Sequence, residues 1–308
     1  MKVLVLSRNA DDYRQLLAPA PGLSVEYSTS PTGLSGPVDI LLAEPDYAAA
    51  YVSSGLDVSW IQSTWAGVRP IVEALAIADA APIVTGVKGI FGLQIAEYVL
   101  AFLLREVRRS ALFERQQTDG VWEEVWPGTL KGRTAVILGM GSIGSELARA
   151  LRVFGVRCVG VSRSGSPVAA FDETFAFPMC REAVAEADIV VSTLPDTAET
   201  EGLIDRAMLG SMGGGSTLVN VGRGSNVDEA ALADVMAQTP TRRALLDVFA
   251  VEPLPQDSPL WRLPNVTITP HVAAVSHPHE IAGIFATNCT HFLKGAPLDF
   301  VVDLQLGY

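Results

Sequence analysis

The chain has 308 residues, 49% of them apolar, which suits two domains with buried interiors. Its formal net charge of −12 argues against nucleic acid and anionic membranes as partners, because both would repel such a chain. Its 3 cysteines lie far apart without a C-x-x-C pair, so we expect neither a disulfide framework nor a bound metal. With no signal-peptide core and no membrane-spanning apolar run, the sequence predicts a soluble cytoplasmic protein.

Short β-branched runs alternate with helical patterns along the whole chain, which is typical of an α/β fold with parallel sheets. The first part predicts one small open sheet. Its expected strands and helices are Val3–Leu6, Asp11–Leu17, Val25–Tyr27, Ile40–Leu42, Trp60–Ser63, Val68–Ala78 and Ile83–Val84. The amphipathic pattern from Leu93 to Gln117 lacks Gly and Pro and predicts one long helix bridging two domains.

A second, denser alternation of strands and helices follows the connector at 119–132. The expected elements are Ala135–Leu138, Ile143–Phe154, Val156–Ser162, Arg181–Glu186, Asp188–Leu194, Thr217–Val221, Asp228–Ala237, Ala244–Asp247, Val266–Ile268 and a last helix over His277–Lys294. We therefore expect two open parallel-sheet domains. A flavodoxin-like substrate domain spans 1–95 and is completed by the helical segment 275–308, and a Rossmann cofactor domain spans 96–274.

A glycine pattern, G-x-G-x-x-G, follows the strand expected at Ala135–Leu138 and stands at the start of a helix. The first glycine permits a tight turn, the second lets backbone approach a pyrophosphate, and the third lets helix pack on strand. Alone the pattern is weak and more often a simple turn, but its strand-turn-helix-strand setting indicates a dinucleotide site. The loop residues expected at the cofactor are Gly139, Met140, Gly141, Ser142, Ile143 and Gly144.

The type of dinucleotide depends on the end of the next strand, where a carboxylate usually binds the ribose hydroxyls of NAD(H). Here that end carries Ser162, Arg163 and Ser164 and no carboxylate. A guanidinium and hydroxyls suit a 2′-phosphate, so we expect NADP(H) to be favoured over NAD(H). The alternative is that Arg163 is a solvated loop residue.

Three chemically suggestive residues follow later strands of the same domain: Arg223 in "VNVGRGS", Glu252 in "LLDVFAVEPLP" and His271 in "VTITPHVAA". Singly, each has a structural alternative: half of an ion pair, a helix cap or surface acid, and a satisfied histidine. Together they suit hydride transfer to a carbonyl, with arginine holding a substrate carboxylate, histidine supplying the proton, and glutamate keeping the imidazole protonated and oriented.

These motifs resemble the D-isomer-specific 2-hydroxyacid dehydrogenase family. The likeness covers nearly the whole chain and rests on "LKGRTAVILGMGSIG", "ADIVVSTLPDTAETEGLID", "LVNVGRGSNVDEAAL", "LLDVFAVEPLP", "SPLWRLPNVTITPHVAA" and a terminal "GY". The resemblance implies that Arg223 binds a 2-oxo acid, His271 is the acid/base and Glu252 supports His271. It also implies a homodimer joined through the cofactor domains.

The resemblance adds further site residues. It implies that the backbone amides of Ala66 and Gly67, in "STWAGVRP", hold the substrate carboxylate. On the cofactor, it implies that Leu194, Pro195 and Thr200 line the adenosine side, that Val221, Arg223 and His271 lie at the nicotinamide end, and that Asp247 meets the carboxamide.

Two residues of the "STWAGVRP" turn depart from the family pattern. Arg69 stands where the family commonly has Asp, and Trp65 where a small residue is common. Arg69 either is simply exposed or contacts substrate. Trp65 either narrows the pocket toward a small substrate such as glyoxylate or hydroxypyruvate, or packs in the core of the turn.

The function expected is NADPH-dependent reduction of a small 2-oxo acid to the 2-hydroxy acid. Two alternatives stay open. One is a nicotinamide-sensing binding protein with the same fold, which would have no use for the complete set of Arg223, Glu252 and His271. The other is a dehydrogenase of the same family for another 2-hydroxy acid.

Overall fold

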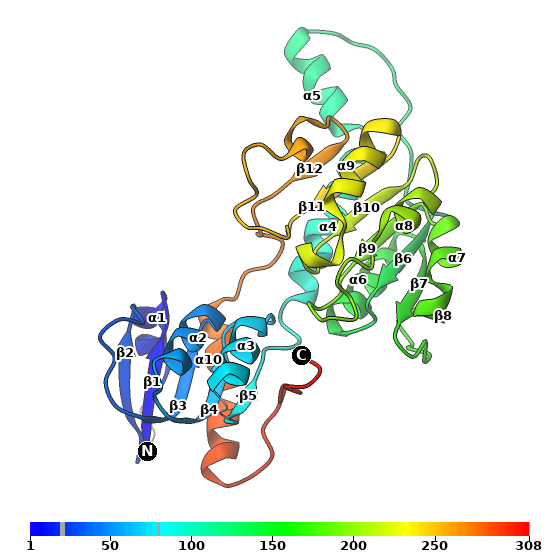
Figure 1. Ribbon diagram of the computed structural model, residues 1–308. Helices are drawn as coiled ribbons and strands as arrows, with labels where there is room; N and C mark the ends of the chain where they lie inside the picture. The colour runs from blue at the N-terminus through cyan, green and yellow to red at the C-terminus, as the bar shows by residue number, and fades with distance from the viewer. Residues whose placement is uncertain (19–21, 79–80, 308) are drawn as a thin grey trace. The chain divides into compact units, whose positions relative to one another are not determined.

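The computed structural model describes residues 1–18, 22–78 and 81–307 (Figure 1). Tyr308 of the terminal "GY" lies outside these residues. The chain divides into two compact units. The first unit comprises Met1–Ile90 and Ser276–Tyr308, and the second comprises Phe91–Val275. Among the described residues, no helix is both long and apolar enough to cross a lipid bilayer.

The first unit contains a five-stranded parallel sheet in the order β2-β1-β3-β4-β5. The strands are β1 (Lys2–Leu6), β2 (Ser24–Ser28), β3 (Val38–Ala43), β4 (Val58–Ser63) and β5 (Ile83–Thr85). The helices are α1 (Ala10–Leu16), α2 (Pro45–Ser53), α3 (Arg69–Ala78) and α10 (Pro278–Leu293). Because the inner strands are buried on both faces, they read in the sequence as continuous apolar runs.

The C-terminal helix α10 belongs to the core of the first unit. The fully buried Trp60 ring of β4 stacks on Phe285 at 5.4 Å between ring centroids and lies 5.3 Å from Phe292. Next to them, Asn288 donates a 3.1 Å hydrogen bond to the buried side-chain oxygen of Gln62. These contacts join the two ends of the chain in one domain.

The second unit contains a seven-stranded parallel sheet in the order β12-β11-β10-β9-β6-β7-β8. Its strands are β6 (Thr134–Leu138), β7 (Arg157–Ser162), β8 (Glu173–Ala176), β9 (Ile189–Ser192), β10 (Thr217–Asn220), β11 (Arg243–Leu246) and β12 (Val266–Ile268). Its helices are α4 (Gly92–Val107), α5 (Ser110–Asp119), α6 (Ser142–Val153), α7 (Cys180–Ala185), α8 (Arg206–Ser211) and α9 (Glu229–Gln238). Short 3-10 turns are η1 (Phe177–Met179), η2 (Gly224–Asn226) and η3 (Pro259–Arg262).

The strand orders confirm the predicted fold class of two parallel-sheet α/β domains. In the second sheet β6 lies between β7 and β9, so the chain reverses its winding direction beside the glycine loop. Ligands of open α/β sheets bind at such a switch point, outside the carboxyl ends of the strands. The loops that follow β6, β7, β9, β10, β11 and β12 all leave from that edge.

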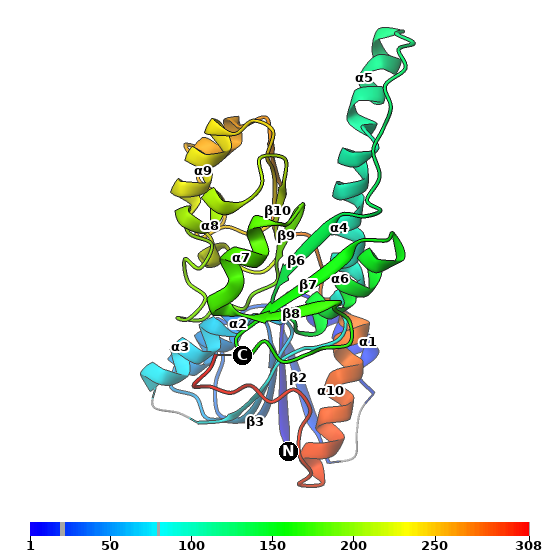
Figure 2. The same ribbon diagram turned by 90° about the vertical axis from the view of Figure 1, so that its right-hand side faces the viewer.

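The single long helix expected from Leu93 to Gln117 is wrong. The chain breaks at Arg109, which adopts a left-handed φ of 57° and donates its N–H to the carbonyl of Glu106. Both resulting helices, α4 and α5, belong to the second unit, and neither bridges the two units. Figure 2 shows α5 standing away from the sheet, and α5 has no buried residue. Helical periodicity continued across the break and therefore hid it.

Candidate active site

The glycine loop after β6 has the backbone that a pyrophosphate site requires. Gly139 has a φ of 104°, and a Cβ there would lie 2.7 Å from the hydroxyl oxygen of Thr193. At Gly144 a Cβ would lie 2.0 Å from the carbonyl oxygen of Gly139, so α6 can approach β6 only without one. A Cβ at Gly141 would meet no atom within 4 Å, which leaves open space before the N-terminus of α6. The free N–H groups of that first turn suit phosphate oxygens.

The loop after β7 begins with Arg163. The Ser162 hydroxyl accepts a 3.1 Å hydrogen bond from the Gly165 amide, and the Ser164 hydroxyl bonds that of Ser166 at 3.0 Å. The side chain of Arg163 is exposed, and its Nη1 lies 3.5 Å from a carboxylate oxygen of Glu199. Arg163 could be singled out from the sequence, but its acidic neighbour Glu199 could not.

The loop after β9 contributes structure more than side-chain chemistry. Leu194 and Thr200 are buried. The Thr200 hydroxyl donates to the Pro195 carbonyl at 2.7 Å and accepts from the Thr197 amide at 3.1 Å. The Thr200 hydroxyl is therefore engaged within its own loop, and the adenosine-side role expected of Thr200 stays a prediction.

Arg223 follows β10 and is fixed through its backbone. Its carbonyl accepts from the Asn220 side chain at 2.9 Å, and its amide donates to the Asn226 side chain at 3.1 Å. At the next residue, a Cβ on Gly224 would lie 1.8 Å from the Phe249 carbonyl carbon, so only glycine lets this loop contact the one after β11. Val221, before Arg223, is buried.

The Arg223 guanidinium donates to the Gly222 carbonyl at 2.6 Å and has no carboxylate within ion-pair distance among the described residues. Burial lowers the pKa of Arg223 from its ordinary value, while the negative charges of Asp196 and Glu252 act in the opposite direction. A partly desolvated cation without a direct counter-ion costs free energy, which an anionic ligand would offset.

Glu252 and His271 are brought together as the sequence predicts. His271 Nδ1 lies 2.8 Å from Glu252 Oε2, and Glu252 Oε1 accepts the Phe249 amide at 2.9 Å. With Nδ1 directed at the carboxylate, Nε2 is the ring nitrogen left to exchange a proton with a ligand. The imidazole is half exposed, so it is accessible for that exchange.

Asp247 organises the histidine loop, a role that the sequence did not reveal. Its carboxylate is buried and accepts from the Thr269 hydroxyl at 2.6 Å and from the amides of Val272 and Ala273 at 2.9 Å each. Its carbonyl accepts the amide of His271, whose φ is 55°. The carboxylate thus fixes the backbone on which the imidazole stands. The sequence feature that could have indicated this role is an aspartate directly after the strand β11.

A tyrosine on α4 completes this network. The Thr269 hydroxyl gives its one proton to Asp247, so Tyr98 donates to Thr269, at 2.5 Å. Burial raises the pKa of Tyr98 to about 12, which keeps the phenol a donor at neutral pH. The long helix α4 is thereby tied to the loop of His271.

The turn after β4 in the first unit presents Trp65 to solvent. Its side chain is 45% exposed, so the core-packing alternative for Trp65 is wrong. The amides of Ala66 and Gly67 donate to no acceptor in the described part of the chain. Arg69 is exposed on α3 and pairs with Glu73 at 2.7 Å. The turn thus offers two backbone donors beside an exposed aromatic ring.

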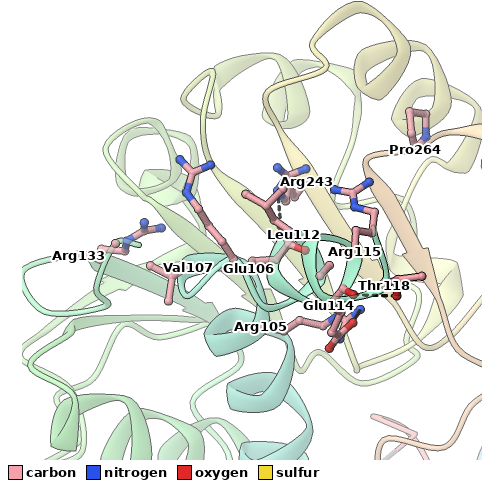
Figure 3. Close-up of a pocket in the computed structure, with 13 residues that line it drawn as sticks. Arg105, Glu106, Val107, Leu112, Glu114, Arg115, Thr118, Arg133, Arg243 and Pro264 are labelled. Atoms are coloured by element: carbon pink, nitrogen blue, oxygen red, sulfur yellow. Dashed lines mark hydrogen bonds and ion pairs between the residues drawn. The ribbon is translucent and has the colours of Figure 1, made fainter. Parts of the chain in front are cut away.

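A separate hollow of the second unit is lined by arginines. Figure 3 shows four of these side chains, Arg105, Arg115, Arg133 and Arg243, and Arg109 also lines the hollow. Arg105 pairs with Glu114 at 2.9 Å, and Arg243 with Glu106 at 2.5 Å. The remaining three arginines have no acidic partner among the described residues. This hollow is distinct from the loops that carry Arg223 and His271.

A Rossmann sheet with a phosphate-binding glycine loop and an Arg-Glu-His set beside it defines a nicotinamide-dependent oxidoreductase. The family model "D-isomer specific 2-hydroxyacid dehydrogenase, NAD binding domain" matches residues 100–273, and the chain belongs to this family. The family is therefore the one that the sequence motifs predict.

Relatives of known name agree with this assignment. Glyoxylate/hydroxypyruvate reductase A of Salmonella heidelberg is 33% identical over 219 residues, covering 70% of each chain. A D-isomer specific 2-hydroxyacid dehydrogenase family protein from Aeromonas salmonicida is 39% identical, with a TM-score of 0.92 over 98% of this chain and 99% of that one. One from Xanthobacter autotrophicus, in complex with NADPH and MES, is 30% identical, with a TM-score of 0.87 over 100% and 99% of the two chains.

Replacing Asp247 should loosen the histidine loop. In Asp247→Ala the Thr269 hydroxyl and two buried amides lose their acceptor, and we expect the free energy of unfolding to fall by at least about 2 kcal/mol. Amide hydrogen exchange at Val272 and Ala273 should accelerate at least about tenfold. Asp257→Ala, an exposed acid of the same unit, is the control and should change neither quantity. Unaltered exchange at both amides in Asp247→Ala would contradict the role of Asp247.

Proposed function

We propose that the protein is an NADPH-dependent reductase that converts a small 2-oxo acid of the glyoxylate or hydroxypyruvate type to the 2-hydroxy acid. The observation that carries the proposal is the Glu252–His271 pair next to a partly buried Arg223 that has no carboxylate within ion-pair distance among the described residues. The name of the Salmonella relative supports this reaction, and the NADPH complex of the Xanthobacter protein supports this cofactor.

Arg223 would hold the substrate through its carboxylate. The guanidinium presents several N–H donors in a plane, which matches a carboxylate and leaves a donor for the neighbouring carbonyl oxygen. Because the group is partly buried, water screens its charge less than at an exposed site. The same donors would stabilise the negative charge that develops on the carbonyl oxygen during reduction.

His271 would deliver the proton that this oxygen needs. Glu252 would accept a hydrogen bond from Nδ1–H, which fixes the ring orientation and stabilises the imidazolium form. The proton on Nε2 then passes to the oxygen as the carbon–oxygen double bond becomes a single bond. In the reverse direction, neutral His271 takes the hydroxyl proton back.

A bound nicotinamide cofactor would supply the hydride. The site fits such a group because Gly141 faces open space and the N-terminus of α6 offers free amides. Arg163 would pair with the 2′-phosphate that distinguishes NADPH, since a phosphate forms charge-assisted hydrogen bonds with a guanidinium. Asp247, whose carboxylate supports the His271 loop, would also meet the cofactor carboxamide.

The first unit would contribute the remaining substrate contacts. The amides of Ala66 and Gly67 are suited to a carboxylate, because backbone N–H groups in a turn bind anions well. Trp65 would limit the size of the group beyond the carbonyl carbon, which favours glyoxylate and hydroxypyruvate over longer acids.

Removing the imidazole should abolish turnover without abolishing cofactor binding. We expect His271→Asn to lower kcat for glyoxylate and hydroxypyruvate about 100- to 10,000-fold, followed by NADPH oxidation. NADPH affinity, measured by fluorescence titration, should change by less than about tenfold. His279→Asn, on α10, serves as the matched control.

Two results would contradict this proposal. Equal rates in wild type and His271→Asn would remove the proton-donor role. Tight NADPH binding by the wild type without turnover of any 2-oxo acid would favour a nicotinamide-sensing protein instead.

We also propose that the protein is a homodimer joined through α5 and the segment after it. Trp122 and Trp126 are 95% and 86% exposed, more than a large aromatic side chain on a free surface would normally be. Residues 110–127, which form α5 and the segment after it and are called the arm here, also carry Asp119, Glu123 and Glu124. The arginine-lined hollow of Figure 3 offers three guanidinium groups of opposite charge. A second copy of the chain would satisfy both features.

Polar replacements on the arm should therefore separate the copies. Light scattering coupled to size-exclusion chromatography should give a dimer for the wild type and a monomer for the double variant Trp122→Ser/Trp126→Ser. Trp261→Ser, a half-exposed tryptophan elsewhere in the same unit, should stay dimeric. A double variant that remains dimeric, or a monomeric wild type, would contradict the proposed interface.

A further inference from the structure

Arg163 and Glu199 form an ion pair across the strand that carries the glycine loop. Arg163 directly follows β7, and Glu199 lies in the loop after β9. These two strands flank β6 on either side. Arg163 Nη1 and Glu199 Oε2 are 3.5 Å apart, and their side chains are 53% and 66% exposed. The pair is thus open to solvent and to a ligand at the carboxyl edge of the sheet.

The backbone beneath Arg163 is fixed, so only its side chain can choose between partners. Gly165 has a φ of 67°, and a Cβ there would lie 2.5 Å from the Ala176 amide nitrogen. The Thr174 hydroxyl donates to the Gly165 carbonyl at 2.9 Å, which ties the loop to β8. A guanidinium on a fixed backbone can turn toward Glu199 or toward a phosphate.

The loop that carries Glu199 is also fixed by internal hydrogen bonds. The Thr200 hydroxyl closes it through Pro195 and Thr197, which places the Glu199 carboxylate outside the loop core. Within the described residues, Arg163 is the sole basic group within ion-pair distance of Glu199. A phosphate that takes Arg163 must therefore displace this carboxylate and also approach its negative charge.

We propose that Glu199 sets the cofactor selectivity of the protein by competing with the 2′-phosphate of NADPH for Arg163. The inference rests on the proposed role of Arg163. A cofactor without that phosphate leaves the ion pair intact, so Glu199 weakens the binding of NADPH and not of NADH. Glu199 therefore reduces the difference in affinity between NADPH and NADH that Arg163 creates.

The test compares wild type, Glu199→Gln, Arg163→Ala and the double variant, with Glu201→Gln as a charge-matched control in the same loop. Dissociation constants for NADPH and NADH are measured by fluorescence titration on the full chain. Glu199→Gln should bind NADPH about two- to fivefold more tightly, the range expected for an exposed ion pair, and NADH with unchanged affinity. The gain should shrink at high salt.

The remaining variants distinguish a failure of the Glu199 competition from a failure of the cofactor role proposed for Arg163. Arg163→Ala should weaken NADPH binding at least about tenfold, and in that background Glu199→Gln should change no more than Glu201→Gln. Weaker NADH binding in Glu199→Gln, an equal gain in Glu201→Gln, or a full gain without Arg163 would overturn the competition. An unchanged NADPH affinity in Arg163→Ala would instead overturn the cofactor role proposed for Arg163.

Discussion

The partly buried guanidinium of Arg223 is the charge on which the candidate site depends. Burial lowers its pKa, and the opposing charges of Asp196 and Glu252 act on it without an ion pair at contact distance in the described chain. Such an arrangement is unfavourable in the absence of a ligand, because a cation removed from water keeps few of its hydrogen bonds. The loop around it, with Gly224 against Phe249, holds the charge in place despite that cost.

The rest of the site follows from the same sheet edge. Because β10, β11 and β12 are neighbours, the loops after them bring Arg223, Glu252 and His271 together from positions far apart in sequence. Asp247 then fixes the histidine loop, and Tyr98 on α4 supports Asp247 through Thr269. The Glu252 carboxylate thus orients the imidazole ring, and the Asp247 carbonyl accepts the backbone amide of His271. The orientation of the His271 ring is therefore fixed although its side chain is half exposed.

The sequence was informative wherever the chemistry depends on local pattern. The glycine loop and the Glu252–His271 pair could both be predicted, because parallel strands deliver successive loops to one edge. The two parallel sheets could be predicted from the same alternation of strands and helices.

Features that depend on tertiary contact could not be predicted. The break at Arg109 left the helical period intact, so periodicity could not show it. The partners of Asp247 come from Thr269, Val272 and Ala273, which are distant in sequence, and the Arg163–Glu199 pair joins two separate loops. Trp65 needed its exposure to be known before core packing could be ruled out.

The most direct test of this account is the binding of oxamate, an unreactive analogue of a 2-oxo acid, to Arg223→Gln in the presence of NADPH. Calorimetry should show a loss of oxamate affinity of at least about 100-fold, since charge-assisted hydrogen bonds to a buried carboxylate are lost. The free energy of unfolding without ligand should not fall, because the variant removes a partly desolvated charge that lacks a direct counter-ion. Oxamate binding that stays within about threefold of the wild type, or a fold weakened without ligand, would contradict the role of Arg223 as the carboxylate clamp.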